Sequence, residues 1–210
     1  MNDRDALCLV LNRLNADVGG LFNLVEKHNS ECEEDDQRLW PFWAFSRMLF
    51  PVAEAVGYLV YGKGNSWDLI EILENEFESV RTGYRGKAAL IVLLFRHSLI
   101  HTDELRILCF NGIGKIGWII SWASSRAHLK ILKQDTAFPI LHFSPQSFYE
   151  DLVVVCNNLL RRDFDGLIAK RYERWKTYDI HVNKHGQNGS RKGTGIENRA
   201  MDEFKDILKT

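Results

Sequence analysis

The sequence predicts a mainly helical fold of the α+β class, with a small antiparallel β-meander inserted after the fourth helix. Three observations predict it. Apolar residues recur every third or fourth position up to about residue 95 and again after residue 145, which is the period of helices with one buried face. Between about residues 105 and 143 the chain has short segments rich in β-branched and aromatic residues, which is typical of strands. With 210 residues, 45% of them hydrophobic, the chain can bury a substantial core.

Four helices are predicted in the first half. The first covers about residues 5–28, with Gly19-Gly20 weakening its middle, and an acidic connector follows it. The second covers about residues 36–61; it is rich in aromatic residues, and Pro51 should kink it. Ser66 is the expected N-cap of a third helix ending near residue 80. A fourth helix begins near Tyr84 and is apolar almost all round, so we expect it to be central.

The predicted strands cover about residues 105–110, 115–123, 127–133 and 140–143. Asn111-Gly112 is a favoured hairpin dipeptide. Alternate residues of the second strand should share one face and pack against the helices: Ile116, Trp118, Ile120 and Trp122. Residues 112–117 also match a Gly-x-Gly-x-x-Gly dinucleotide-binding pattern. However, a strand rather than a helix is predicted directly after them, so we interpret these residues as a hairpin turn.

The remaining chain is predicted to contain one more long helix and a tail. Ser144-Pro145 supplies its N-cap and first helical residue, and its buried stripe extends to Leu159 or, in a longer alternative, to Leu167. Residues 1–180 would then form one helical domain carrying the β insertion at about 105–143. Residues 181–195 are polar and glycine-rich, which predicts a flexible linker, and residues 196–210 can form a short amphipathic segment.

The net charge, the cysteines and the apolar runs exclude several classes of function and location. The formal net charge of -1 argues against a protein that coats nucleic acid by bulk electrostatics, so any such contact should be local. The four cysteines have no zinc-type spacing and are expected to be reduced thiols; they are Cys8, Cys32, Cys109 and Cys156. We find no signal-peptide pattern and no apolar run of about 18 residues, so we expect a cytoplasmic protein with no membrane contact.

The segment that ends the apolar fourth helix, Arg96-His97-Ser98-Leu99-Ile100-His101, carries the clearest chemistry. Arginine binds phosphate through a two-pronged guanidinium, and histidine exchanges protons near neutral pH. Arg96 could stabilise the transition state of a cleaved RNA phosphate while His101 acts as general acid or base. The reaction needs two proton transfers, so two protomers meeting at their motifs would complete the site. The mechanism therefore predicts a homodimer.

This segment resembles the signature of the HEPN superfamily, Arg-x(4 to 6)-His with a polar residue after the arginine. Arg96 and His101 match it, and His97 takes the polar position. The resemblance implies a HEPN-like helical bundle and a metal-independent endoribonuclease of the prokaryotic defence or toxin type. It also implies catalytic roles for Arg96, His97 and His101, no cofactor, RNA as substrate, a composite site at a homodimer interface, and an antitoxin or other partner protein.

Two alternatives stay open for the motif. Arg96 and His101 can instead pair with Asp103, Glu104 or backbone carbonyls, in which case the chain is a non-catalytic interaction or ligand- or nucleotide-binding module. His97 and His101 share a helix face and could form half of a metal site, but zinc needs a third ligand, so we expect no metal.

Basic residues are concentrated between residues 161 and 192, where nine Lys or Arg residues face four Asp or Glu residues. Arg171, Arg174 and Lys176 are interleaved with aromatic residues and could guide single-stranded RNA by charge and stacking. The alternative is a solvated helix face with aromatic contacts to the core. His128 and His142 have no ligand spacing, and the sequence assigns them no role.

Overall fold

The computed structural model describes residues 1–34, 38–39, 41–64, 66–97, 107–110, 114–122, 126–132 and 138–176. The chain divides into two compact units, Met1–Glu173 and Arg174–Thr210, and only the first three residues of the second unit are described. The predicted linker at 181–195 and the C-terminal segment at 196–210 lie outside the described residues. None of the described helices is both long enough and apolar enough to span a membrane.

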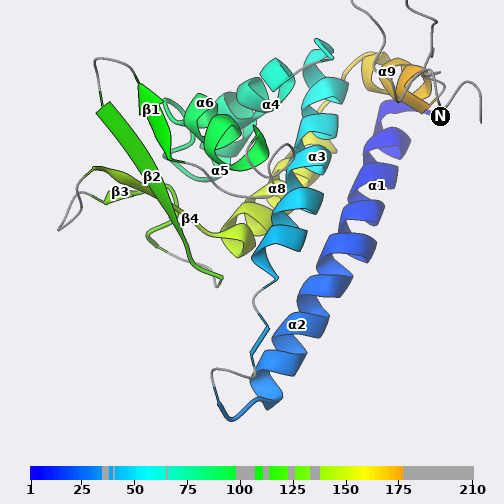
Figure 1. Ribbon diagram of the computed structural model, residues 1–210. Helices are drawn as coiled ribbons and strands as arrows, with labels where there is room; N and C mark the ends of the chain where they lie inside the picture. Colours follow the sequence, from blue (N-terminus) through cyan, green and yellow to red (C-terminus); the bar gives the residue numbers. More distant parts are fainter. Residues whose placement is uncertain are drawn as a thin grey trace, which may run out of the picture. The chain divides into compact units, whose positions relative to one another are not determined.

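The predicted first helix is confirmed as one helical run built of α1 (Asp3–Arg13), a π-helical turn (Leu14–Gly19) and α2 (Gly20–Glu31) (Figure 1). A capping box starts it: the Asn2 side chain accepts the backbone N–H of Asp5, and the Asp5 carboxylate accepts that of Asn2. The π-helical turn ends at Gly19, so the irregularity falls where the glycine pair was expected to weaken the helix.

The second helix, α3 (Phe42–Tyr61), starts about six residues later than predicted. The cause is Pro41, since a proline disfavours helical backbone at the residue before it. Helix α3 packs against the N-terminal run, α4, α8 and the fourth helix, which makes it the centre of unit 1 (Figure 1). Its contact with α4 is close at Gly57, where a Cβ atom would lie 2.4 Å from the backbone oxygen of Asp68.

The third predicted helix is confirmed as α4 (Ser66–Ile72), a π-helical turn (Leu73–Phe77) and α5 (Glu78–Val80). Ser66, the predicted N-cap, is instead its first helical residue. The fourth consists of α6 (Ala88–Ile91) and a π-helical turn (Val92–His97). It starts four residues after Tyr84, because residues 81–87 form a turn. Its central position is confirmed, because Leu94 and Phe95 are fully buried.

The strands form one four-stranded sheet in the order β1-β2-β4-β3, with β1 (Leu108–Phe110), β2 (Gly114–Ile120), β3 (Ile131–Leu132) and β4 (Ile140–Phe143). The β1–β2 and β3–β4 pairs are antiparallel. The predicted antiparallel meander is wrong, because β4 runs parallel to β2, with Gly117 opposite Ile140, and separates β2 from β3. Periodicity specifies which face of a strand is buried but not which strand lies beside it. The connection of residues 121–139 is long enough to return the chain in the parallel direction.

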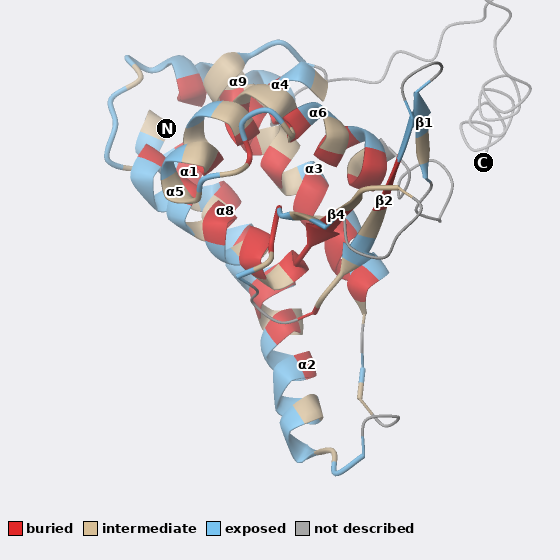
Figure 2. Ribbon diagram, turned by 90° about the vertical axis from the view of Figure 1, so that its left-hand side faces the viewer, coloured by how far each residue is buried: buried red, intermediate tan, exposed pale blue. Residues whose placement is uncertain are grey.

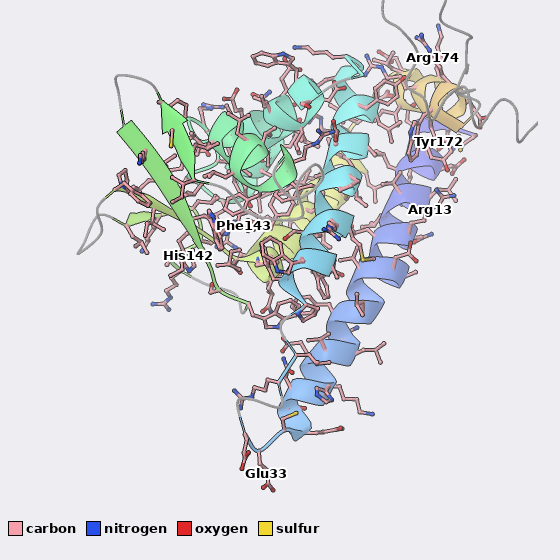
Figure 3. The ribbon with its side chains drawn as sticks, viewed as in Figure 1. Arg13, Glu33, His142, Phe143, Tyr172 and Arg174 are labelled. Atoms are coloured by element: carbon pink, nitrogen blue, oxygen red, sulfur yellow. The ribbon has the colours of Figure 1, made fainter. Side chains whose placement is uncertain are left out.

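The sheet packs on the helices through the face that the alternation predicts. Ile116 and Trp122 are buried, whereas Ile119 on the opposite face is 44% exposed. On β4, the side chain of Phe143 points into the core (Figure 3). Its ring stacks with those of Phe50 and Phe95. Figure 2 shows that the buried residues gather where the helices and the sheet meet, and that much of α2 is exposed toward its end.

Helix α8 (Pro145–Leu159) starts as predicted, because the Ser144 hydroxyl accepts the backbone N–H of Ser147 and proline is the first helical residue. The longer alternative is wrong. Asp165 has a left-handed backbone with φ 53, and a separate helix, α9 (Leu167–Lys176), follows. The Asp3 carboxylate accepts the backbone N–H groups of Gly166 and Ala169, so a residue from the other end of unit 1 caps α9.

Candidate functional site

Arg96, the first residue of the predicted catalytic motif, is paired with Glu54 of α3. Its Nε donates to Oε2 at 3.1 Å, and its Nη2 donates to Oε1 at 3.1 Å and to Oε2 at 2.9 Å. The arginine and glutamate side chains are 18% and 22% exposed. The pair joins the π-helical end of the fourth helix to the middle of α3.

This pairing determines how Arg96 can meet an anion. Glu54 occupies the Nε–Nη2 edge of the guanidinium, so a phosphate would have to use the Nη1–Nη2 edge or displace the carboxylate. The ion pair fixes the orientation of the arginine and offsets part of its charge. In the sequence, Glu54 carries no signal for this role, because its partner is 42 residues away.

Most of the other motif residues lie outside the described part of the chain. His97 ends the π-helical turn, and its side chain is outside the described part of the chain, as are residues 98–106. The catalytic and metal-binding predictions for His101, and the pairing alternative with Asp103 or Glu104, therefore fall outside the described residues. Within the described residues, no group of three or more His, Cys, Asp and Glu side chains could hold a metal ion.

Arg171, predicted to contact RNA, is engaged inside the fold. Its Nη1 donates to the backbone oxygens of Leu59 and Val60, which belong to the last turn of α3. A cation at this position satisfies carbonyls that the helix leaves without partners and interacts favourably with the helix dipole. Arg174 is exposed on α9, and the side chain of Lys176 is not described.

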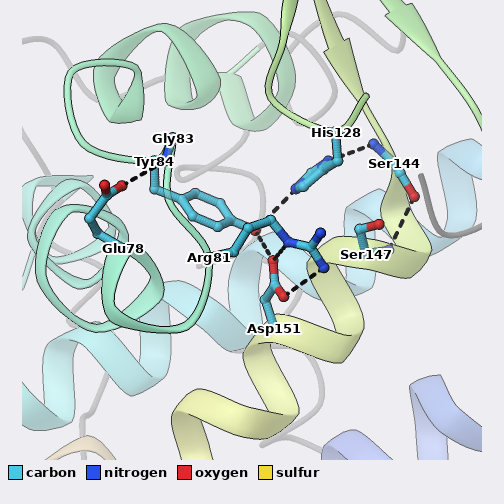
Figure 4. A network of polar contacts seen from close by, with 8 residues as sticks. All are labelled: Glu78, Arg81, Gly83, Tyr84, His128, Ser144, Ser147 and Asp151. Atoms are coloured by element: carbon cyan, nitrogen blue, oxygen red, sulfur yellow. Dashed lines mark hydrogen bonds and ion pairs between the residues drawn. The ribbon is translucent and has the colours of Figure 1, made fainter. Parts of the chain in front are cut away.

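A polar network that the sequence did not suggest lies between the 81–87 turn, the sheet and α8 (Figure 4). Asp151 of α8 is its centre. Arg81 donates to it from Nε at 2.7 Å and from Nη2 at 3.0 Å, and the Tyr84 hydroxyl donates to it at 2.8 Å. The Tyr84 oxygen is also 3.1 Å from Nε2 of His128.

The backbone assigns the proton positions in this network. The N–H of Ser144 donates to Nδ1 of His128 at 2.9 Å, so Nδ1 is the unprotonated nitrogen of the ring. A neutral His128 then carries its hydrogen on Nε2 and donates it to Tyr84, which donates its own hydrogen to Asp151. The His128 ring, the Tyr84 hydroxyl and the Asp151 carboxylate therefore each have a hydrogen-bond partner in this network.

Burial dominates the acid–base behaviour of the network. It lowers the pKa of His128 to about 3, and the nearby charge of Arg81 and the neighbouring His142 act in the same direction. Burial also raises the pKa of Tyr84 well above its usual value, with Asp151 adding to the effect. The hydrogen bond to Asp151 is the main cause of the raised pKa of Arg81. At neutral pH the network therefore contains a neutral imidazole and phenol and one tight ion pair.

One sequence signal could have identified this network. Asp151 lies three residues after Phe148 and four before Val155, so an acidic residue sits within the predicted buried stripe of α8. A buried carboxylate needs a charged or hydrogen-bonding partner. The identity of those partners was not predictable, because Arg81 and Tyr84 are 70 and 67 residues away.

Comparison of the chain with family models, with curated proteins and with solved structures finds no match in any of the three.

Proposed function

We propose that this chain is a metal-independent endoribonuclease with a HEPN-like fold, whose active site is completed by a second copy of the chain. The observation that carries the proposal is the position of Arg96. Its guanidinium stands at the end of a buried apolar helix, is partly exposed, and is held in one orientation by Glu54. Its placement in a π-helical turn supports the same interpretation, since such turns are frequent at functional sites.

In this proposal a general base removes the proton from the ribose 2′-hydroxyl, and the 2′-oxygen forms a bond to the phosphorus. The bond from phosphorus to the 5′-oxygen breaks, and a general acid protonates the leaving oxygen. Arg96 binds the phosphate and stabilises the charge that develops on it. His101 supplies proton transfer, His97 assists, and the second protomer contributes the second imidazole.

The first test is cleavage of an end-labelled RNA pool in EDTA. The wild type should cut the RNA, whereas His101→Ala and Arg96→Ala should leave it intact while keeping their far-UV circular dichroism. Arg13→Ala removes an exposed arginine of α1 and should cut like the wild type. Arg96→Lys keeps the charge but loses the two-pronged geometry, so it should also fail to cut. Cleavage by Arg96→Ala at the wild-type rate would contradict the proposal.

The composite site is tested by sedimentation equilibrium. The wild type should be a dimer at the concentrations at which it cuts RNA. A monomer that cuts RNA equally well would contradict the shared site while leaving the role of Arg96 open to the cleavage test.

The proposed contact of α9 with RNA is tested by neutralising Arg174 and Lys176. The double variant should bind RNA more weakly, and its binding should depend less on salt concentration.

A second candidate function is favoured by the same ion pair. If Arg96 only joins the fourth helix to α3, the chain is a non-catalytic interaction or ligand-binding module. The wild type would then not cut RNA. In addition, Arg96→Ala, Glu54→Ala and the double variant would lower the stability non-additively, since a bidentate pair contributes through both partners. The cleavage assay on the wild type separates the two candidates.

A further inference from the structure

A basic pocket opens where the turn of residues 81–87 faces the turn that precedes β3. Its volume is about 550 Å³, within the range of small-molecule sites. Four of its lining side chains are Lys or Arg: Arg81, Lys87, Arg126 and Lys130. Among the residues that the structure describes, no Asp or Glu lines the pocket.

The inner wall of this basic pocket is held in place by the buried network. Arg81 and His128 line it, while Asp151 and Tyr84 hold them from within (Figure 4). The Arg81 side chain remains 34% exposed, although Asp151 binds its Nε and Nη2. The guanidinium is therefore oriented before any ligand arrives, which lowers the entropy cost of binding.

The two turns also have constrained backbones. Gly83 has φ +115, and a Cβ atom there would lie 3.5 Å from the Cβ of Leu129. Leu129 itself has a left-handed backbone with φ 65 and a buried side chain, which is unusual for leucine. Glu78 accepts the backbone N–H of Gly83 at 3.0 Å and so anchors the first turn. The exposed cations Arg126 and Lys130 are thus presented from a turn with a defined shape.

The charge of the pocket contrasts with that of the whole chain. The protein has a formal net charge of -1, yet four cations line this pocket, and Asp151 binds one of them, Arg81, from within. A concave site lined by one sign of charge raises the local concentration of oppositely charged ligands. The pocket therefore has both the charge and the side chains that an anion site requires.

We propose that the basic pocket binds the diphosphate or triphosphate group of a small molecule. The negative charges of RNA are spread along the strand, one per phosphate. The four cations instead line one cavity, so they match a ligand whose negative charges lie close together, as in a diphosphate. Base stacking has no aromatic platform there, since the imidazole of His128 is the one ring among the described lining residues and it is buried. This inference does not rest on the proposed ribonuclease.

The test is titration calorimetry of the full chain with inorganic pyrophosphate. The pocket variant is Arg126→Gln/Lys130→Gln, because both residues are exposed and neither is part of the network. The matched control is Arg161→Gln/Lys170→Gln, which removes the same charge from exposed positions outside the pocket. A short single-stranded RNA is titrated in parallel to distinguish a free diphosphate from an RNA backbone.

We expect the wild type to bind pyrophosphate with one site per chain. The pocket variant should bind it at least about tenfold more weakly, since each charge-assisted hydrogen bond is worth that much or more. The control should stay within about twofold of the wild type, because distant exposed charges are screened by salt. Absence of pyrophosphate binding to the wild type, or equal losses in both variants, would overturn the proposal. RNA binding that depends on Arg126 and Lys130 but is not displaced by pyrophosphate would overturn it as well.

Discussion

The buried histidine of the polar network predicts a specific loss of stability in acid. Burial, followed by the effects of Arg81 and His142, lowers the pKa of His128 in the folded protein to about 3, against an ordinary value near 6.5 in an unfolded chain. The unfolded state therefore binds more protons between these two values. By linkage, the free energy of unfolding is at its full value above about pH 6.5 and falls as the pH is lowered toward 3.

The size of the effect follows from these two values. Each pH unit inside the window costs about 1.4 kcal/mol. Because the loss begins only near the unfolded pKa, lowering the pH from 7 to 5 should remove about 2 kcal/mol through His128 alone. This is a large share of the stability of an ordinary domain.

Urea unfolding at pH 7 and pH 5 measures this contribution in the wild type and in His128→Asn. The asparagine oxygen can replace Nδ1 as acceptor for the Ser144 N–H, and the variant cannot gain a proton. Its absolute stability should be lower, but its loss between the two pH values should be smaller than that of the wild type by about 2 kcal/mol. His142 is present in both proteins, so most of its own contribution cancels in the comparison.

The control is His28→Asn, which removes an exposed imidazole of α2 and should keep the wild-type pH dependence. If His128→Asn does not fold, NMR titration of the imidazole in the wild type tests the same point. Equal losses in the wild type and His128→Asn, or a His128 ring that titrates near pH 6.5, would refute the reasoning.

Two further predictions concern the packing of α3. Gly57→Ala places a methyl group against the Asp68 backbone oxygen and should cost about 1–3 kcal/mol or more. Gly20→Ala, which has open space in a helix, should be neutral or stabilise by up to about 1 kcal/mol. Urea midpoints measure both changes, and a Gly57→Ala variant as stable as the wild type would contradict the close contact between α3 and α4. Arg171→Ala should lower the free energy of unfolding by about 1–2 kcal/mol, because the Leu59 and Val60 carbonyls lose their donor. Arg161→Ala, at an exposed position, should change it by less than about 0.5 kcal/mol. If urea unfolding of Arg171→Ala equals that of the wild type, Arg171 has no role in stability and only the RNA-binding interpretation remains.

Local signals predicted most elements because each depends on a few neighbouring residues. Ser144-Pro145 marked the start of α8, since a cap and a fixed φ act on the adjacent turn. Alternation placed Ile116 on the buried face of β2, since side chains of a strand alternate whatever its partner is, and Trp122, two residues beyond the strand, is buried as well. The start of α3 was missed, although Pro41 was a local signal that outweighed the apolar pattern before it.

The sequence alone therefore determined the order and the approximate positions of most helices and strands, which of their faces are buried, and that Arg96 lies at the end of an apolar helix. Only the tertiary structure decided that β4 pairs with β2, that Glu54 binds Arg96, and that Arg81, Tyr84 and His128 converge on Asp151. The physical reason is the range of the interactions. Periodicity and capping act over one or two turns of chain, whereas strand pairing and buried polar contacts depend on which distant segments share a boundary once the core is packed.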